Sequence, residues 1–384
     1  MLHEVNLENF RDINTPFYFY DVEILARNLK IIKTLARKYD FKVHYALKAN
    51  SNERILKIIS ANEFGADCVS KYEIERALQN GFHSQDIVFA GVGKRDDEIE
   101  FAIHYEISEV NVESIEELIV IQEIAKKLTK KVNVAIRINP FIDAKTHQLI
   151  TTGMQKSKFG ISGKEIPGII HVLKNSEFLQ FVGIHFHIGS QISDFKVYKR
   201  LSFVINRYIK LLEKSGLNIR SVNVGGGIAI NYGYPDEPIH EKFEAYFKIF
   251  YDNIINFKKY QFKCEPGRSV VGNCGDIITR ILYKKPVNGH EMLVVDASMT
   301  ELIRPALYHS FHKIEPLKVN SSIKKYTVVG PICESSDIFG TNIDLPESGR
   351  GDLLRIRSCG AYAESMASKY NLRPFAKAYF SDDF

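Results

Sequence analysis

Short strand-like runs alternate with helical patterns along most of the chain. The runs begin near Val43, Gly65, Ile87, Glu109, Val132, Phe181, Ile219 and Tyr260. Helical periodicity fills the intervals between them, over 53–61, 71–80, 95–104, 113–128, 163–174, 194–215 and 239–257. Strands that alternate with helices form parallel sheets, and eight strands in about 220 residues predict a TIM-type (β/α)8 barrel. A doubly wound sheet is disfavoured because no GxGxxG follows the first strand.

The pattern changes after Pro266. Strand-like segments separated by Gly, Pro and Asn turns follow at 276–283, 291–297, 326–332 and 352–357. Helical periodicity is short or absent there, which predicts a separate all-β domain.

The aromatic run at 16–20 also reads as a strand, and it could join this β domain. Asp21 then serves as a candidate N-cap for the first helix. We therefore expect a barrel over 23–265 and a β-sandwich or β-barrel domain made of 1–22 and 266–384.

The charge and cysteine content argue against several protein classes. A formal charge of +5 is spread along the 384 residues, which is too weak and diffuse for a nucleic-acid-binding surface. No segment approaches the roughly 18 apolar residues of a membrane span. The five cysteines form no CxxC pair, so the sequence indicates neither a disulfide framework nor a metal site. We expect a protein of the reducing cytoplasm.

Lys48 lies where the strand around Val43 gives way to a helix. Val43, Tyr45 and Leu47 alternate with His44 and Ala46, which is a β pattern, and the polar residues 50–52 supply N-cap chemistry for a helix beginning near 53. A lysine at the end of a strand is ordinarily solvated. The residues at the other strand ends make this lysine different.

In such barrels the active site lies at the carboxyl ends of the strands. Those ends carry chemically active or small residues: Lys48, Asp67, Ser70, Gly91, Asn111, Arg137, Asn139, His187, Gly189, Ser190, Gly225, Gly226, Gly227, Glu265 and Arg268. A purely structural barrel has no need to collect a lysine, a histidine, three glycines and a glutamate on one rim.

The three glycines follow the seventh strand, close to where such barrels bind phosphate. Their backbone N–H groups could close on an anion, although a flexible turn is an equally good interpretation of a glycine run. Ser190 and Arg268 could add a hydroxyl and a positive charge.

A lysine, a phosphate cradle and a carboxylate together indicate pyridoxal phosphate. Lys48 would hold this cofactor as a Schiff base, and Glu265 would bond the ring nitrogen and keep it protonated. His187 could lie against the ring, but His185 on the same face leaves the choice between the two histidines open.

The predicted β domain carries further candidates. Cys333 precedes Glu334, and Tyr362 follows Gly360. Arg304 and Tyr308 are four residues apart, so they share a face only if that stretch is helical. A cysteine beside a glutamate is weak evidence by itself, since most buried cysteines are inert.

Seven motifs in collinear order closely resemble the fold-type III pyridoxal-phosphate decarboxylases, and within them the diaminopimelate decarboxylases. They are YALKAN (45–50), HFHIGSQ (185–191), NVGGG (223–227), CEPGRS (264–269), LIRPALY (302–308), GPICESSD (330–337) and GAY (360–362). The resemblance covers nearly the whole chain. It implies a homodimer in which the barrel of one subunit meets the β domain of the other at each active site.

The resemblance also implies residue roles. Lys48 is the Schiff-base lysine, His187 stacks on the ring and Glu265 faces the ring nitrogen. The other cofactor-binding residues are Asp67, Ser190, Gly225, Gly226, Gly227, Gly267, Arg268 and Tyr362. The implied substrate-binding residues are Arg268, Arg304, Tyr308, Glu334 and Tyr362, and Cys333 from the partner subunit resembles the proton donor.

One motif departs from its relatives, which usually read Ser-Gly-Gly-Glu where this chain has Ser70-Lys71-Tyr72-Glu73. Two bulky residues in place of glycines leave the backbone after the second strand in doubt.

The implied reaction removes CO₂ from meso-2,6-diaminopimelate to give L-lysine, the last step of lysine biosynthesis. Arg268 and Arg304 suit a distal carboxylate, and Glu334 suits the ammonium beside it. Decarboxylases of carboxynorspermidine, ornithine or lysine are the alternatives. A non-catalytic relative with a regulatory role is less favoured, because Lys48 and Cys333 are both present.

Overall fold

The structure is a computed structural model that describes residues 10, 12–143, 157–287, 289–317 and 322–384. The chain divides into two compact units. The barrel unit consists of 29–229 and 239–269, and the β unit consists of 1–28, 230–238 and 270–384. Residues 1–9 and 11, which belong to the expected β domain, lie outside the described part.

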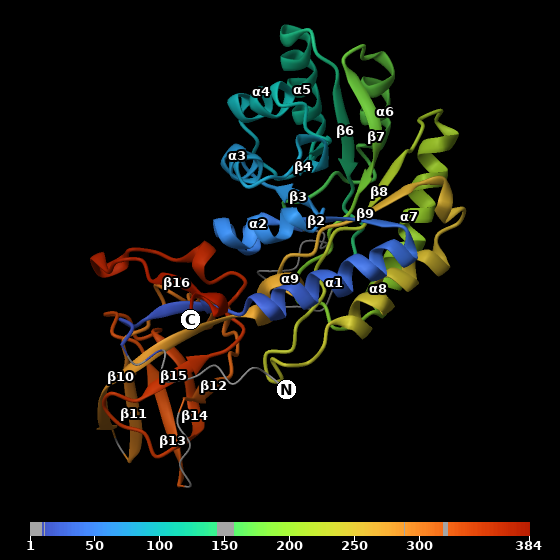
Figure 1. The fold of residues 1–384 in the computed structure, drawn as a ribbon. Helices are drawn as coiled ribbons and strands as arrows, with labels where there is room; N and C mark the ends of the chain where they lie inside the picture. Colours follow the sequence, from blue (N-terminus) through green and yellow to red (C-terminus); the bar gives the residue numbers. More distant parts are fainter. Residues whose placement is uncertain (1–9, 11, 144–156, 288, 318–321) are drawn as a thin grey trace. The chain divides into compact units, whose positions relative to one another are not determined.

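Eight parallel strands close into a barrel in the barrel unit, which confirms the TIM-type prediction (Figure 1). Strand β9 pairs with β2 and closes the barrel. The strands are β2 (Phe41–Ala46), β3 (Gly65–Cys68), β4 (Ile87–Phe89), β5 (Glu109–Val112), β6 (Val132–Arg137), β7 (Leu179–His185), β8 (Ser221–Asn223) and β9 (Gln261–Cys264).

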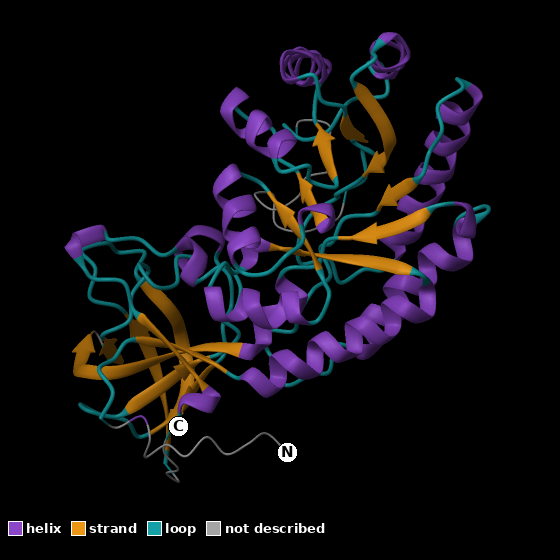
Figure 2. Ribbon diagram, turned by 45° about the horizontal axis from the view of Figure 1, so that its top comes forward, coloured by secondary structure: helices purple, strands orange, loops and turns teal. Residues whose placement is uncertain are grey.

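Helices follow the strands in the predicted order and lie outside the barrel (Figure 2). They are α2 (Glu53–Ala61), α3 (Lys71–Gln79), α4 (Asp96–His104), α5 (Ile115–Leu128), α6 (Ile166–Asn175), α7 (Lys196–Lys214) and α8 (His240–Asn253). Helix α2 has the predicted bounds because Asn52 caps it, its side chain accepting the Arg54 N–H. The predicted N-cap Asp21 likewise accepts the N–H of Ile24 at the start of α1 (Val22–Tyr39).

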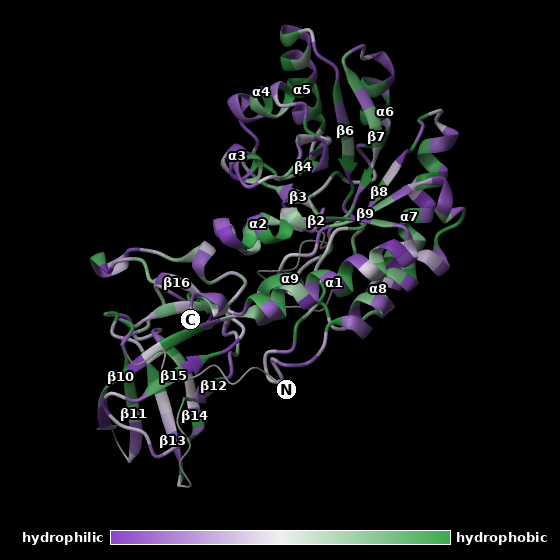
Figure 3. Cartoon of the chain, viewed as in Figure 1, coloured by the Kyte–Doolittle hydropathy of each residue, from purple (hydrophilic) through white to green (hydrophobic). Residues whose placement is uncertain are grey.

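The barrel core lies between the strands and these helices. Every second strand residue is apolar and buried, as at Tyr45, Val110, Ile184 and Phe262. Helix α7 shows the matching periodicity, with Val197, Leu201, Ile205, Tyr208 and Leu212 buried. Figure 3 shows hydrophilic and hydrophobic residues interspersed along the helices, as expected for amphipathic helices with one buried face.

The β unit is built on an eight-stranded sheet, which confirms the second part of the fold prediction. Its strands run in the order β12-β15-β10-β11-β13-β14, with β1 paired to β10 and β16. Their bounds are β1 (Phe17–Tyr20), β10 (Gly275–Val287), β11 (His290–Val295), β12 (Ile314–Pro316), β13 (Ile323–Val329), β14 (Ile338–Pro346), β15 (Leu353–Ile356) and β16 (Lys377–Phe380).

The N-terminal strand β1 belongs to this sheet, as its aromatic composition suggested. It pairs antiparallel with β10 and parallel with β16. All four of its residues are buried, and Phe17 and Phe19 pack with Phe10, Ile278 and Leu353 in one cluster. Burying several rings together explains why a short strand from the chain start is retained here.

Some elements were not predicted. Strands β12, β14 and β16 and the short helices α9 (Arg268–Val271) and α10 (Arg304–Tyr308) lie in the turn-rich region, where periodicity is too brief to read. Among the described helices, none combines the length and apolarity that a membrane span needs. The described residues also contain no group of three His, Cys, Asp or Glu placed to hold a metal.

Candidate functional site

Lys48 lies just beyond the end of β2, in the 3-10 turn Leu47–Ala49 rather than in the strand itself. Its Nζ lies 2.6 Å from Oδ2 of Asp67, at the end of the neighbouring strand β3. The Asp67 side chain is fully buried, whereas the Lys48 side chain is 35% exposed. The barrel therefore aims one accessible amine at a carboxylate that cannot reach solvent.

Glu265 follows β9 and is held at both oxygens. The Asn223 amide donates to Oε1 at 2.6 Å, and the ring of His185 lies 3.0 Å from Oε2 through Nε2. All three side chains are buried. Burial raises the pKa of Glu265, but His185 and Lys48 outweigh it and hold the pKa below its usual value. Glu265 is therefore an ionised carboxylate inside the barrel.

The pKa of Asp67 shifts in the opposite direction to that of Glu265. Burial and then the charge of Glu265 raise the pKa of Asp67, while Lys48 partly offsets them. Lys48, Asp67 and Glu265 therefore act on one another electrostatically, which places them around one part of the barrel.

The two histidines of the HFHIG motif have separate partners. His185 contacts Glu265, and His187, beyond the end of β7, accepts the Gly226 N–H through Nδ1 at 3.3 Å. Burial, followed by the positive charges of Arg137 and Lys48, lowers the pKa of His187 well below its usual value. His187 is consequently a neutral ring, which suits a flat contact better than acid–base work.

The three glycines are required by close packing of the backbone. A Cβ at Gly225 would meet the Phe186 carbonyl oxygen, one at Gly226 that of Glu265, and one at Gly227 that of Gly189. Gly225 and Gly227 also have positive φ angles of 73° and 95°. Only glycine lets these loops approach so closely.

The amide groups of the glycines are not equivalent. Gly225 N–H donates to Asn223 Oδ1 at 3.0 Å, and Gly226 N–H donates to His187. Within the described part of the chain, no acceptor is found for Gly227 N–H. Nearby, the Arg268 guanidinium donates to Ser190 Oγ at 3.1 Å, so the structure brings together the two residues that the sequence assigned to one anion.

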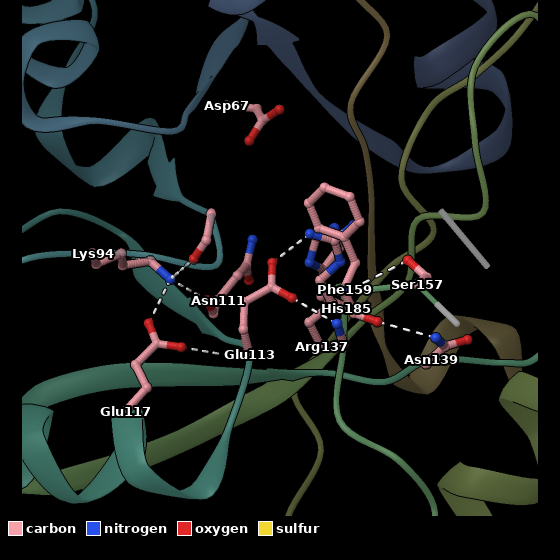
Figure 4. A network of polar contacts seen from close by, with 12 residues as sticks. Asp67, Lys94, Asn111, Glu113, Glu117, Arg137, Asn139, Ser157, Phe159 and His185 are labelled. Carbon is pink, nitrogen blue, oxygen red and sulfur yellow. Dashed lines mark hydrogen bonds and ion pairs between the residues drawn. The ribbon is translucent and has the colours of Figure 1, made fainter. Parts of the chain in front are cut away.

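A second polar network lies at the ends of β5 and β6 (Figure 4). Sequence reasoning placed Arg137 and Asn111 at the strand ends but gave them no role in the site. Arg137 pairs with Glu113, and both side chains are buried. Glu113 also accepts the Gly160 N–H at 2.7 Å. Lys94 donates to the Gly91 and Asn111 carbonyl oxygens and to Glu117, so it joins the loop after β4 to strand β5 and helix α5. The signal available in the sequence was the position of Arg137 at a strand end.

Most substrate candidates lie in the β unit, whereas Arg268 lies in the barrel unit. Arg304 begins α10, so it and Tyr308 lie on one helical face. The Arg304 guanidinium donates to the Tyr232 hydroxyl at 2.7 Å and lies 2.8 Å from His312 Nε2.

The remaining candidates of the β unit lie in loops. Cys333 and Glu334 are exposed, and the Tyr370 hydroxyl donates to Glu334 at 2.8 Å. Cys333 is the one exposed cysteine of the five; the others are buried. Tyr362 has a φ of 57°, which is uncommon for a bulky residue and indicates a constrained loop.

The departing motif folds without strain. Ser70 caps α3 by accepting the Glu73 N–H, and Glu73 accepts the Val69 N–H at 2.7 Å. Lys71 and Tyr72 are the first helical residues, and neither has a positive φ. Because these positions need no glycine, the bulky pair is accommodated, and Lys71 pairs with Asp97 at 2.7 Å.

The family description "Pyridoxal-dependent decarboxylase, pyridoxal binding domain" matches residues 23–272. The chain is 46% identical to diaminopimelate decarboxylase of Bacteroides thetaiotaomicron over 98% of both chains. It is 42% identical to that of Helicobacter pylori, covering 96% of this chain and 90% of the relative. The chain belongs to the diaminopimelate decarboxylase family.

Solved structures of the diaminopimelate decarboxylase family have the same fold. The crystal structure of the Helicobacter pylori enzyme complexed with L-lysine superposes with a TM-score of 0.89 at 40% identity, covering 97% of this chain and 93% of that one. The enzyme of M. jannaschii with L-lysine gives 0.90 at 33% identity, covering 97% and 88%. The chain is thus a pyridoxal-phosphate-dependent decarboxylase.

The residues of the barrel unit fit this cofactor. Glu265 is ionised, and its two donors leave lone pairs for a ring N–H. Gly227 N–H and the Arg268 guanidinium suit a phosphate. Lys48 supplies the amine. Each group is thus of the chemical type that one part of pyridoxal phosphate requires.

Proposed function

We propose that this chain decarboxylates meso-2,6-diaminopimelate to L-lysine and CO₂, the last step of lysine biosynthesis. The observation that carries the proposal is the combination of full-length similarity to diaminopimelate decarboxylases with an ionised Glu265 inside the barrel that presents Lys48. The L-lysine bound by two structural relatives is the product that this reaction would release.

The barrel residues would hold the cofactor in the following way. Lys48 binds it covalently, Glu265 binds its ring nitrogen, and neutral His187 covers one ring face. Ser190, Arg268, Gly267 and the three glycines bind its phosphate, and Asp67 lies beside Lys48. When bound, pyridoxal phosphate accepts the electron pair released as CO₂ leaves. Glu265 supports this because a carboxylate at the ring nitrogen stabilises the protonated ring.

Arg268 of the barrel unit and the candidates of the β unit would bind the substrate. Arg268 and Arg304 suit the distal carboxylate because a guanidinium can bond both of its oxygens, and Glu334 suits the distal ammonium. Tyr308 and Tyr362 add hydroxyl donors. Arg304 is buried and oriented by Tyr232 and His312, so little conformational freedom would be lost when it binds a ligand.

Cys333 would deliver the proton that replaces the lost carboxylate. Its exposure agrees with a role at a surface shared by two subunits, and we propose a homodimer in which Cys333 and Glu334 serve the partner's barrel. In this proposal the domains divide near residues 22 and 265, with the β domain supplying the substrate-binding and donor residues. The enzyme would work in the cytoplasm.

The test is CO₂ release by purified protein with added pyridoxal phosphate. We expect rapid release from meso-diaminopimelate and much slower release from L-ornithine, L-lysine and carboxynorspermidine. Faster CO₂ release from one of the other three compounds would show that this compound, and not meso-diaminopimelate, is the substrate. The absence of release from all four, with cofactor bound, would favour a non-catalytic relative.

A further inference from the structure

The interior of the barrel is lined by polar side chains. The register places Lys42 of β2 level with Lys263 of β9, and His44 and Ala46 of β2 level with Gly65 and Asp67 of β3. Continuing around the barrel, the same face carries Gly65, Val88, Glu109, Asn111, Asn133, Ala135, Arg137, Gly183, His185, Ser221, Asn223 and Gln261. Val88 is the only large apolar side chain on that face of the described strands.

An ion pair across the barrel shows that this face points inward. Lys263 on β9 lies 2.7 Å from Glu109 on β5, and these strands stand four positions apart in the closed barrel. Both side chains are at least 95% buried. The interior of a barrel of this kind is usually filled with Val, Ile and Leu, so a polar interior needs another explanation.

Several polar atoms of this interior have no protein partner although they are shielded from solvent. They are both ring nitrogens of His44, both amide atoms of Asn111, Oδ1 of Asp67, Oε1 of Glu109 and Nδ1 of His185. Each of these side chains is at least 98% buried. Leaving so many groups unsolvated would consume the net stability of an ordinary domain, so the groups must have partners.

The interior also has small residues where a filled barrel has large ones. Ala46, Gly65, Ala135 and Gly183 lie on the inward face beside the unpartnered groups. The His44 ring packs against Gly65 and the Ser221 backbone against Gly183, so little of the space beside these two glycines is left. The missing partner must therefore be small, and it must both donate and accept, because Asn111 offers a donor and an acceptor while Glu109 and Asp67 offer acceptors. Water has these properties, and buried water typically makes two to four such bonds.

We propose that the barrel interior holds a cluster of ordered water molecules bound by His44, Asp67, Glu109, Asn111 and His185. The water binds the far sides of two groups already described: Asp67, which pairs with Lys48, and His185, which holds Glu265. Figure 4 shows Asp67, Asn111 and His185 in one view. It therefore solvates the charges beneath the cofactor while the strands exclude bulk solvent. The proposal does not depend on which amino acid is the substrate.

High-resolution crystallography of the protein with its cofactor tests the proposal directly. We expect density for water within hydrogen-bond distance of the Asn111 amide, the His44 ring and the second oxygen of Glu109. An interior without such density, or one in which these side chains bond one another, would overturn the proposal.

Two substitutions of Asn111 give opposite results for a hydrated and a dry interior. Asn111→Leu removes both polar atoms at nearly equal size. If water is present, the leucine side chain cannot hydrogen-bond to the water molecules beside it. We therefore expect the melting temperature of this variant to fall by several degrees. In a dry interior the same change replaces an unsatisfied amide with a well-suited apolar group, so a rise would refute the proposal.

Asn111→Ala is the matched control, since it leaves space instead of filling it. We expect an additional water in place of the amide and a smaller fall in melting temperature than for Asn111→Leu. An empty space at that position in the crystal structure of this variant would count against a hydrated interior, even if Asn111→Leu fails to fold.

Discussion

Lys48 and Asp67 form an ion pair in which one partner is fully buried. A buried carboxylate is strongly disfavoured without a counter-charge, so Asp67 depends on the lysine amine. The same amine is the group that our proposal assigns to the cofactor. Lys42 lies on the same face of β2 at the other end of the strand. It therefore serves as a control lysine when the covalent role of Lys48 is tested.

Lys48→Ala should abolish covalent attachment of the cofactor. After borohydride reduction, we expect wild-type protein to gain the mass of one reduced cofactor and Lys48→Ala to gain none, with the visible absorbance band lost. Lys42→Ala is the control and should be labelled like the wild type. Labelling of Lys48→Ala at the wild-type level would show that another amine binds the cofactor.

Glu73 gives a prediction about pH. Burial raises the pKa of Glu73 to about 7, above its ordinary value of 4.5. Between these values the folded protein retains a proton that the unfolded chain has released, so this group's contribution to stability falls as pH rises through the window.

Glu73→Gln should remove that pH dependence while keeping an acceptor for the Val69 N–H. The melting temperature of the variant relative to wild type should therefore rise between about pH 5 and pH 8. Glu75→Gln, an exposed position on the same helix, is the control. A difference in melting temperature between Glu73→Gln and wild type that stays constant across this pH range would show that the pKa of Glu73 is not raised.

At the scale of elements, the start of α3 shows how the chain accommodates an unusual motif. The Ser70 cap and the Glu73 side chain satisfy backbone N–H groups, and Lys71 adds an ion pair with Asp97. The helix begins at the two positions where the family resemblance led us to expect glycines, so this chain should gain local stability from residues with better helix propensity.

The double variant Lys71→Gly, Tyr72→Gly should lower the free energy of unfolding by roughly 1 kcal/mol, as judged from glycine's helix propensity. Urea unfolding measures the change, and cofactor absorbance should be unaltered. The matched control is Lys71→Ala, Tyr72→Ala, which removes the same side chains but keeps a helix-forming backbone. Equal losses in both variants would assign the effect to the side chains instead.

Element boundaries were predictable where local chemistry defines them. Helix α2 was correctly placed because Asn52 caps it, and β1 was recognised from its aromatic run. Strands β12, β14 and β16 were missed because they lie among turns. Lys48 was expected at a strand end, but a 3-10 turn follows Ala46, and one short turn leaves no periodic signal.

At the scale of the whole molecule, the proposed dimer makes each active site depend on two chains. Lys48 would come from one subunit and Cys333 from its partner. Proton delivery by a positioned acid typically raises a rate by roughly 10²–10⁴. The Cys333→Ala variant should therefore release CO₂ slowly but should still bind the cofactor.

Mixing inactive variants tests this arrangement. Lys48→Ala and Cys333→Ala protein, mixed in equal amounts and allowed to exchange subunits, should regain about a quarter of the wild-type CO₂ release, because half of the dimers then carry one intact site. Lys48→Ala mixed with the double variant Lys48→Ala, Cys333→Ala is the control and should regain nothing. Failure of the first mixture despite demonstrated subunit exchange would place both residues of a site in one chain.

The sequence by itself determined the order of strands and helices, the barrel and the kinds of residue at the strand ends. These depend on a period of two or 3.6 residues and on caps, which act between near neighbours in the chain. The strand-end candidates such as Lys48 and Glu265 were readable for the same reason, whereas the roles of the β-unit candidates came from the family resemblance. The contact partners of these residues were not readable.

Only the tertiary structure decided which groups meet. His185 contacts Glu265, Lys263 crosses the barrel to Glu109, and the glycines are needed where carbonyl oxygens of other loops approach. These contacts join residues far apart in the chain, and they arise because β9 closes on β2 in one register. Closure also turns the polar half of most strands inward, and no local pattern shows which half that is.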